Sequence, residues 1–389
     1  MCLQYSDTLS KPTFPILMTG SFDRTVRIWN VETGCELKCL QGHQRVVRAL
    51  QFDERILITA SMDKTLKVWD WRNGECIRTL EGHTEGVISL AFDDDVLVSG
   101  SVDATVKVWN LRTGESHTLY GHRDWINAVL LWDGMPVPRH TEALVPDPGA
   151  RKLVFSASDD GAIRLWDLST RECIRELTGH MAQVQSIKLA YMEGDDGDDE
   201  GTENGSIASL PSGPPVTGPV THWEDKAAAM IDEEEPGSTH VEGEPVHRKR
   251  GPYAVLISGS LDNTMKMWDI ESGTCLKTYF GHIEGLWAVA VDKRHIVSAS
   301  HDRTIKASCM IPNSVIQTDV FPLDQIWYRE GELSAHTLVG HRAAVTCLEI
   351  TDDKIISGSD DGDIRIWSFA PERSGPHCQH PNAGVALPS

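Results

Sequence analysis

Short apolar segments alternate with polar turns along most of this chain, and one arrangement of them recurs at a nearly constant interval. Residues 43–83 contain one period, in which VVRALQF, ILITAS, TLKVW and CIRTL follow one another between short polar stretches. Each segment has the length of a β-strand and is rich in Val, Ile, Leu and Thr, which favour strands. One period therefore predicts a sheet of four antiparallel strands.

One segment of this period can be aligned seven times along the chain. SFDRTVRIWN (21–30), SMDKTLKVWD (61–70) and SVDATVKVWN (101–110) align without a gap, so their tryptophans stand 40 residues apart. The other copies are SDDGAIRLWD (158–167), SLDNTMKMWD (260–269), SHDRTIK (300–306) and SDDGDIRIWS (359–368). Self-similarity at this period is the signature of a repeat architecture. Gly-His pairs separate the copies and end at His43, His83, His122, His180, His282 and His341.

The repeats predict an all-β fold, a seven-bladed β-propeller with four-stranded antiparallel blades over residues 1–369. With 389 residues the chain could form two ordinary domains or one large one, and composition alone does not choose between them. The repeats decide for one ring, because a single blade cannot bury both faces of its sheet and must stack radially against its neighbours.

Polar residues recur at fixed places in each copy. In the second copy, His43, Asp63 and Trp69, with Ser61 or Thr59, resemble the hydrogen-bonded tetrad of WD-repeat proteins. A Ser, a His and an Asp could also form a hydrolase triad, but a triad occurs once in an enzyme and this set recurs around the ring, so we interpret it as structural. The further members of the predicted tetrads are His83, Asp103, Trp109, His122, Asp160, Trp166, His180, Asp262, Trp268, His341, Asp361 and Trp367.

The net charge of the chain indicates which classes of partner it can bind. Fifty-seven acidic residues against 36 Lys and Arg give a net charge of -21, so we expect neither nucleic acid nor membrane as a partner, and the balance favours proteins. The sequence contains neither a long apolar run nor a signal peptide, so we expect a soluble protein of the nucleus and/or cytoplasm.

The cysteines predict neither a disulfide nor a metal site. Nine cysteines occur without CxxC spacing, and Cys76, Cys173 and Cys275 each precede a Gly-His histidine by seven residues. We interpret these three as small apolar fillers in a reducing compartment. No cofactor is expected.

Two long interruptions fall between the first and second strands of a blade. One is a Pro-containing loop at about 133–150. The other is the insert 192–252, in which residues 193–250 contain 15 acidic and four basic residues and are predicted to be disordered. This insert is either a solvated spacer or a carrier of docking or modification sites. Its HRKR run (247–250) is a weak candidate for nuclear import.

Blades six and seven depart from the repeat. Ser308 stands where blade six should have its Trp, and IWYREGELSAHTLVGH resumes the pattern, so we predict an insertion at 307–325, such as a retained intron, after which Ile326 and Trp327 complete the strand. Blade one begins without a Gly-His pair, and only a Pro-rich tail, 370–389, follows Trp367. The tail is predicted to be disordered, the outer strand of blade seven to be missing, and the chain to be truncated at its start.

Several divergent stretches resemble one family. GHRDWINAV (121–129), LVFSASDDGAIRLWDLSTRECIREL (153–177), the acidic insert after GHMAQVQSI and TYFGHIEGLWAVAVDKRHIVSAS (278–300) are similar to the fungal sulfur-controller F-box/WD-repeat proteins. The resemblance implies a substrate receptor of an SCF-type ubiquitin ligase, whose propeller captures a sulfur-regulating transcription factor. The F-box that the family carries upstream is missing, so binding to the ligase adaptor is expected only if an upstream F-box exists; otherwise the product would compete with the full receptor. The alternative is a WD-repeat scaffold subunit unrelated to ubiquitin. A propeller enzyme has little support.

Candidate partner-binding residues lie in the loops after each Gly-His pair and just before each turn Asp, which the resemblance places on the central face of the ring. Exposed aromatic side chains and Arg are common interface anchors. Arg48 alone supplies an Arg at the first-strand position, which favours a mixed apolar and polar contact over one made only to phosphate. The predicted binding face comprises Arg48, Trp287, Trp125, Phe22, Met62, Asn127, Gln185 and His301.

Overall fold

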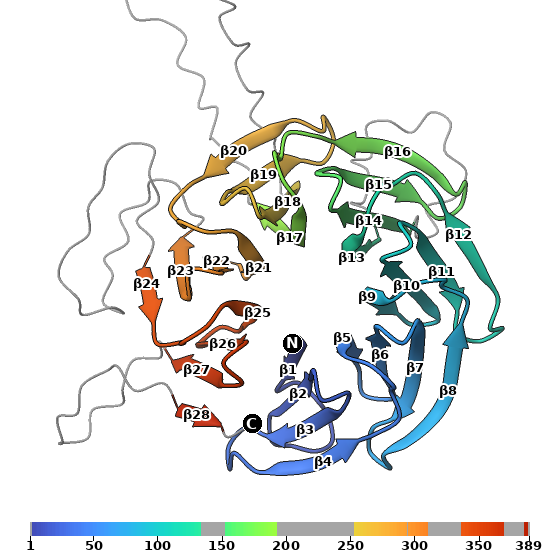
Figure 1. The fold of residues 1–389 in the computed structure, drawn as a ribbon, viewed down its shortest axis with the longest axis vertical. Coiled ribbons are helices and arrows are strands. Elements are labelled where there is room, and N and C mark those ends of the chain that lie inside the picture. The colour runs from blue at the N-terminus through green and yellow to red at the C-terminus, as the bar shows by residue number, and fades with distance from the viewer. Residues whose placement is uncertain are drawn as a thin grey trace, which may run out of the picture. The chain divides into compact units, whose positions relative to one another are not determined.

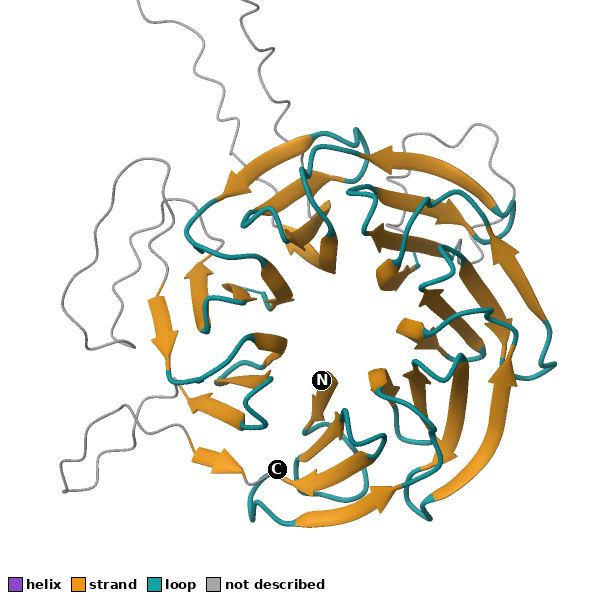
Figure 2. Cartoon of the chain, viewed as in Figure 1, coloured by secondary structure: helices purple, strands orange, loops and turns teal. Residues whose placement is uncertain are grey.

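Seven four-stranded sheets make up the described part of the chain. The computed structural model describes residues 2–133, 152–192, 253–293, 295–309, 336–368 and 385–387. The chain divides into two units, residues 1–192 with 254–389 and residues 193–253, and only Tyr253 of the second is described. Every element assigned in the described residues is a strand (Figure 2).

The strands of each sheet follow one another in chain order from the central channel outward, and each pairs antiparallel with the next (Figure 1). The first three blades are regular, with the fourth strand of each on the outside. Blade one is β1 (Cys2–Ser6), β2 (Ile16–Gly20), β3 (Val26–Asn30) and β4 (Glu36–Leu40); blade two is β5 (Val47–Phe52), β6 (Leu57–Ser61), β7 (Thr65–Asp70) and β8 (Glu75–Glu81); blade three is β9 (Val87–Asp93), β10 (Val96–Ser101), β11 (Val106–Asn110) and β12 (Ser116–Leu119).

The remaining blades repeat this order. Blade four is β13 (Ile126–Trp132), β14 (Leu153–Ser158), β15 (Ile163–Asp167) and β16 (Glu172–Leu177); blade five is β17 (Val184–Met192), β18 (Tyr253–Ser260), β19 (Met265–Asp269) and β20 (Cys275–Tyr279). Blade six is β21 (Leu286–Val291), β22 (His295–Ser300), β23 (Thr304–Cys309) and β24 (His336–Val339); blade seven is β25 (Val345–Ile350), β26 (Lys354–Ser359), β27 (Ile364–Ser368) and β28 (Val385–Leu387). Contacts of β1 with β25 and β26 close the ring. The predicted seven-bladed propeller is confirmed.

The core lies between the blades. The second strand of a blade packs on both of its faces, which is why β2, β6 and β14 are buried at every position. Clusters of buried side chains in the described residues each join two neighbouring blades, and one of them brings Leu3 and Trp29 of blade one against Ile356 of blade seven. Radial stacking therefore supplies the burial that one blade alone could not.

The ring has two unlike faces, because each blade is an antiparallel meander. One face carries the turn between the second and third strands and the loop to the next blade, where the Gly-His pairs lie, and we name it the tetrad face. The opposite face carries the other two connections of each blade. The strand ends that flank residues 134–151, 193–252 and 310–335 all lie on that opposite face, since these ranges join first to second or third to fourth strands.

Two predictions about blade six meet different outcomes. Ser308 pairs with Ile296 in the register that Trp69 has opposite Leu57 in blade two, so the expected loss of one Trp is confirmed. The predicted insertion was to begin at 307, but β23 continues through Ala307–Cys309, because these residues keep the register with β22 that the preceding residues set. Ile326 and Trp327, which were predicted to complete the strand, lie outside the described residues. The rest of the proposed insertion, 310–325, lies outside the described residues.

Blade seven has three strands of ordinary length, and a short segment of the tail takes the place of the fourth. Residues Val385–Leu387 pair antiparallel with Ile364–Ile366. The edge of β27 would otherwise offer unpaired backbone groups, and any short extended segment can pair with such an edge. The prediction that the outer strand is missing is corrected to this extent: the strand is present, but only three residues long. The rest of the tail, and the predicted loop and acidic insert within 134–151 and 193–252, lie outside the described residues.

Candidate functional site

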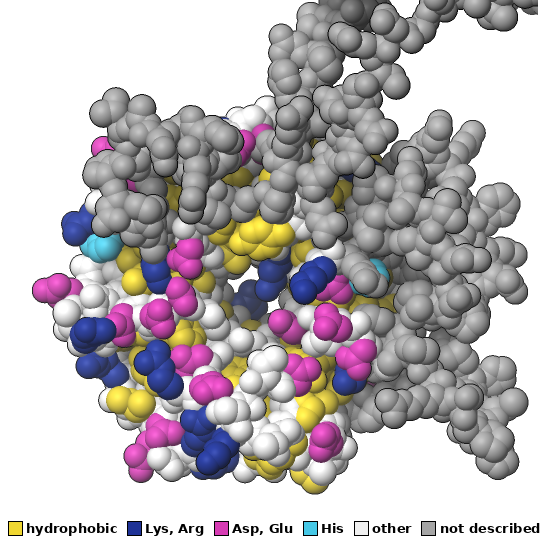
Figure 3. Space-filling view, turned by 180° about the vertical axis from the view of Figure 1, so that it is seen from behind, with side chains coloured by type: hydrophobic (Ala, Val, Ile, Leu, Met, Phe, Trp, Pro, Cys, Tyr) yellow, Lys and Arg dark blue, Asp and Glu magenta, His cyan; other side chains and the backbone are white. Residues whose placement is uncertain are grey.

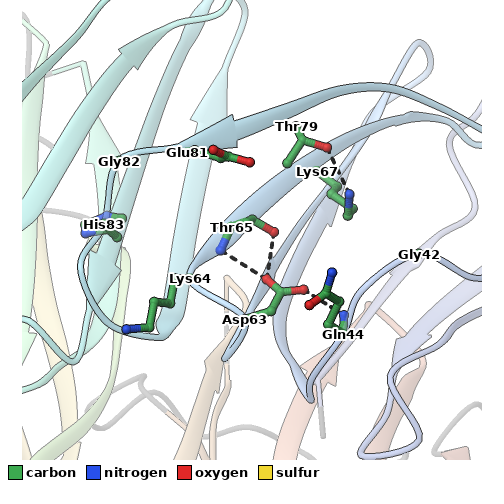
Figure 4. Close-up of a pocket in the computed structure, with 10 residues that line it drawn as sticks. All are labelled: Gly42, Gln44, Asp63, Lys64, Thr65, Lys67, Thr79, Glu81, Gly82 and His83. Carbon is green, nitrogen blue, oxygen red and sulfur yellow. Dashed lines mark hydrogen bonds between the residues drawn. The ribbon is translucent and has the colours of Figure 1, made fainter.

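Each tetrad joins a Gly-His loop to a turn of the same blade. In blade two, Nδ1 of His43 lies 2.8 Å from Oδ2 of Asp63, and its Nε2 lies 2.7 Å from Oγ1 of Thr59. The indole N–H of Trp69 donates to the same hydroxyl at 2.9 Å. Asp63 also accepts from the backbone N–H of Gln44 and from Thr65, as Figure 4 shows. Thr59, rather than Ser61, completes the tetrad.

The same geometry recurs around the ring. The distance from His Nδ1 to Asp Oδ2 is 2.9 Å in blades three and four, 2.8 Å in blades five and six and 3.2 Å in blade seven. The third members are Ser99, Ser156, Ser258, Ser298 and Ser357, and all except Ser298 accept an indole N–H from their blade's Trp. The predicted tetrads thus form as hydrogen-bonded units. Blade six keeps its His282, Asp302 and Ser298.

Blade one is the other exception. The indole N–H of Trp29 donates to the Thr19 hydroxyl at 2.9 Å, which reproduces the bond between Trp and Thr or Ser in the other tetrads. Its turn Asp23 is held by Thr25 and Arg27, and no histidine among the described residues bonds to it. In blade one the turn Asp is therefore held by short-range contacts to Thr25 and Arg27.

Burial and hydrogen bonding shift the pKa values of several tetrad residues. Burial by itself would raise the pKa of Asp63, but the hydrogen bonds from His43, Thr65 and Gln44 outweigh it and hold the pKa of this carboxyl well below its usual range. Burial lowers the pKa of His180, His282 and His341, against the opposing effect of their Asp partners. In these three tetrads neutral imidazole beside carboxylate is the stable pairing near neutral pH, and the groups stabilise the blade rather than store a reactive proton.

A cavity of about 460 Å³ opens beside the tetrad of blade two (Figure 4). Of its two acidic residues, Asp63 and Glu81, Asp63 is engaged in the tetrad on both oxygens, and Lys67 donates to Thr79. Among the described residues, no group of three or more His, Cys, Asp and Glu is arranged to hold a metal ion. The cavity is lined by Gly42, Gln44, Asp63, Lys64, Thr65, Lys67, Thr79, Glu81, Gly82 and His83.

The predicted partner-binding residues occupy the tetrad face but do not form one contiguous cluster. Phe22 and Trp125 are 53% and 45% exposed, and His301 is also exposed. Arg48, Met62, Asn127, Gln185 and Trp287 are half-buried where the first strands and turns approach the channel. Their role in binding stays a prediction. In the view from behind, Lys and Arg side chains lie at the mouth of the channel (Figure 3).

Two sets of these residues contact each other. In blade six, the indole N–H of Trp287 lies 3.3 Å from Nδ1 of His301, and the two rings lie 6.5 Å apart. At blades four and five, the side-chain amides of Asn127 and Gln185 both donate to Asp159. Asp159 precedes a turn Asp and was not among the candidates.

Exposed apolar side chains beside the Gly-His pairs also escaped prediction. Tyr120 and Phe280 precede a pair, Met181 and Ile283 follow one, and all four are strongly exposed. The signal was present in the sequence, since the equivalent places elsewhere hold polar residues such as Gln44 and Thr84. Apolar side chains exposed on one face of a repeat ring point to a surface that binds protein.

The recurring cysteines are misinterpreted from sequence. Cys76, Cys173 and Cys275 are exposed, not buried fillers, because they lie on the outer strands whose edges face solvent. The seven cysteines whose side chains the structure describes, which include the buried Cys347, are free thiols. No helix in the described ranges is long and apolar enough to cross a membrane.

The seven blades and their repeated tetrads define a WD-repeat propeller, and the chain belongs to the family described as WD domain, G-beta repeat. That family matches residues 2–30, 34–70, 74–110, 114–167, 246–269, 273–307 and 333–368, one segment for each blade. Within the family, the chain is similar to fungal proteins of one kind, as the sequence motifs indicated.

Several curated relatives are named as ligase subunits or F-box proteins. The chain is 45% identical to the "Probable E3 ubiquitin ligase complex SCF subunit sconB" of Talaromyces stipitatus, over 77% of this chain and 39% of the relative. It is 35% identical to an F-box protein of Saccharomyces cerevisiae, over 65% of this chain and 35% of the relative. The chain thus spans about two-fifths of the length of these relatives.

A solved structure supports the fold alone. The crystal structure of the computationally designed Ika8 protein is 27% identical to the chain and superposes with a TM-score of 0.57, over 94% of this chain and 82% of that one.

Proposed function

We propose that this propeller is the substrate-recognition part of an SCF-type ubiquitin ligase receptor, and that it captures a transcription regulator of sulfur metabolism. The observation that carries the proposal is its similarity, across most of the ring, to the sconB proteins and to the F-box protein of Saccharomyces cerevisiae. The tetrad face is the binding surface in this proposal, and capture takes place in the nucleus or the cytoplasm.

The geometry of the tetrad face supports binding rather than chemistry as its role. The buried tetrads hold the loops in place at six positions around the channel, so the side chains between them are presented on a rigid frame. Trp125, Trp287 and Arg48 offer anchors of the kind that dominate protein interfaces. The strand ends that flank residues 134–151, 193–252 and 310–335 lie at the other face.

Paired substitutions test the proposal. Replacing Arg48 and Trp287 together with Ala should reduce capture of the sulfur-regulating transcription factor at least about tenfold in a pull-down with purified proteins, with unchanged thermal unfolding. The matched control replaces Arg112 and Tyr191, one exposed Arg and one exposed aromatic residue at the opposite face. The proposal fails if the two double variants bind equally well. If the native chain and both double variants all fail to bind the factor, this factor is excluded as the partner.

A further inference from the structure

The channel mouth between blades four and five contains an acidic group with unusual neighbours. Asp159 directly follows β14, and Oδ1 of its carboxylate accepts from Asn127 Nδ2 at 2.6 Å and from Gln185 Nε2 at 3.3 Å. Asn127 also donates to the carbonyl of Val184 at 3.1 Å. These bonds link the inner strands of two blades and fix the carboxylate at the rim of the channel.

The carboxylate is poorly compensated. Among the described residues, no Lys or Arg nitrogen lies within ion-pair distance of Asp159, and both hydrogen bonds from side chains go to one oxygen. Burial and the charges of Asp124 and Asp160 raise the pKa of Asp159, although the amides of Asn127 and Gln185 act against them. A cation placed at the free oxygen would relieve this cost.

An exposed tryptophan is linked to Asp159 through the backbone. The backbone carbonyl of Trp125 accepts from the N–H of Asp159 at 2.9 Å, and the Trp125 side chain is 45% exposed. The repeat itself does not require an aromatic residue there, since the position three after the Gly-His histidine holds Gly86, Gly285 or Ala344 in other blades. The same backbone bond forms in those blades, so the bond does not depend on which side chain stands at this position.

We propose that Trp125 and Asp159 form a subsite for a basic side chain, arginine or lysine, of the captured protein segment. The cation would lie over the indole face and pair with the free carboxylate oxygen, two contacts that reinforce each other. Asn127 and Gln185 are positioning residues, because they hold the carboxylate in place. The inference rests on the proposed function and adds one chemical requirement to the partner.

Asp159→Asn isolates the charge from the geometry. The amide oxygen of Asn can still accept from Asn127 and Gln185, so the loops should keep their positions. Since the raised pKa means that the charged form is disfavoured in the folded state, this variant should unfold at the same temperature as the native chain or a higher one near neutral pH. The matched control is Asp360→Asn, at the same position of blade seven, where Ala344 stands in place of Trp125.

The test uses a displayed library of random peptides, selected against the native chain, Asp159→Asn and Asp360→Asn. The native chain and Asp360→Asn should select peptides with Arg or Lys enriched at one position, and Asp159→Asn should lose that enrichment. A selected peptide should bind Asp159→Asn about tenfold more weakly, and its Gln analogue should bind both chains equally.

Two results separate the failures. In the first result, the selected peptides lose binding to the Arg48→Ala/Trp287→Ala variant, but they show no preference for Arg or Lys, or Asp159→Asn selects the same preference as the native chain. The subsite is then overturned and the proposed function stands. If no peptide is selected through this face, the tetrad face is not a peptide-binding surface and both proposals fail.

Discussion

In each complete tetrad a single Thr or Ser hydroxyl group bonds to both the Trp and the His. The Oγ1 atom of Thr59, which is fully buried, accepts the indole N–H of Trp69 and lies within hydrogen-bond distance of His43 Nε2. If the hydroxyl is removed, two buried polar groups lose their partner at once. Such orphaned groups cost more than the bond itself contributed.

Thr59→Val tests this arrangement. Valine keeps the shape of threonine but not its hydroxyl, so the free energy of unfolding should fall by about 2–4 kcal/mol. Thr59→Ser keeps the hydroxyl and should lose only about 1 kcal/mol, the contribution of one buried methyl group. Urea unfolding followed by Trp fluorescence measures both. Equal losses for the two variants would show that the hydroxyl contributes nothing specific.

Blade six offers the reverse experiment. Ser308 holds the register position of the tetrad Trp, and Ser298 bonds to His282 with no indole donor from the part of the chain that the structure describes. Ser308→Trp should supply that donor and bury an aromatic ring between blades, so we expect stability to rise by about 1–2 kcal/mol. A loss of stability in the same urea titration would mean that neighbouring residues already fill the space.

At the scale of elements, the outer strands are unequal. The outer strand of blade two pairs with its neighbour over six residues, whereas β28 pairs over three. Each net backbone hydrogen bond contributes roughly 0.5–1.5 kcal/mol, so a three-residue edge strand adds little to the stability of the ring. Blade seven therefore has the weakest outer edge among the described blades.

Proline substitutions compare these edges. Ala386→Pro in β28 should lower the free energy of unfolding by about 1 kcal/mol or less, because few ladder bonds depend on it. Lys277→Pro in β20, where Lys277 pairs with Met267, should cost several times more. Limited proteolysis with mass spectrometry would locate the first cut. The ranking is contradicted if Ala386→Pro destabilises the chain as much as Lys277→Pro.

At the scale of the whole molecule, the tetrad residues of several blades have pKa values shifted in the same direction. His180, His282 and His341 have lowered pKa values, so as pH falls below about 6.5 the unfolded chain binds protons that the folded ring does not. The lowered pKa values of Asp262, Asp302 and Asp361 act the same way below about pH 4. Stability should therefore be lost as the solution becomes acidic.

Urea midpoints at about pH 7 and about pH 5.5, on either side of the ordinary histidine pKa, measure this effect. The native chain should be less stable at the lower pH. His282→Gln should be less stable than the native chain at neutral pH, yet its midpoint should change less between the two pH values, because one buried histidine no longer titrates. An unchanged pH dependence in this variant would show that His282 does not contribute to it.

The sequence predicts what is local and periodic. Blade number and the tetrads follow from spacing, because each blade uses the same strands and turns, and His43, Asp63 and Trp69 keep fixed separations. Contacts that depend on how blades stack leave no such pattern, and the bond from Gln185 to Asp159 is one of them. Strand β28 was missed because three residues carry no periodicity, and the exposure of Cys76 because alternation does not tell which strand is outermost.

The placement of the long connections indicates that one face of the ring tolerates inserted residues and the other does not. The strand ends that flank residues 134–151, 193–252, 310–335 and 369–384 all lie at the face opposite the tetrads, so length added at these places is not added to the loops that the tetrads hold. The same division is useful to an experimenter. A fluorescent protein inserted between Trp132 and Leu153 should report on the chain in cells without reducing partner capture, whereas the same insertion after His122 should abolish it.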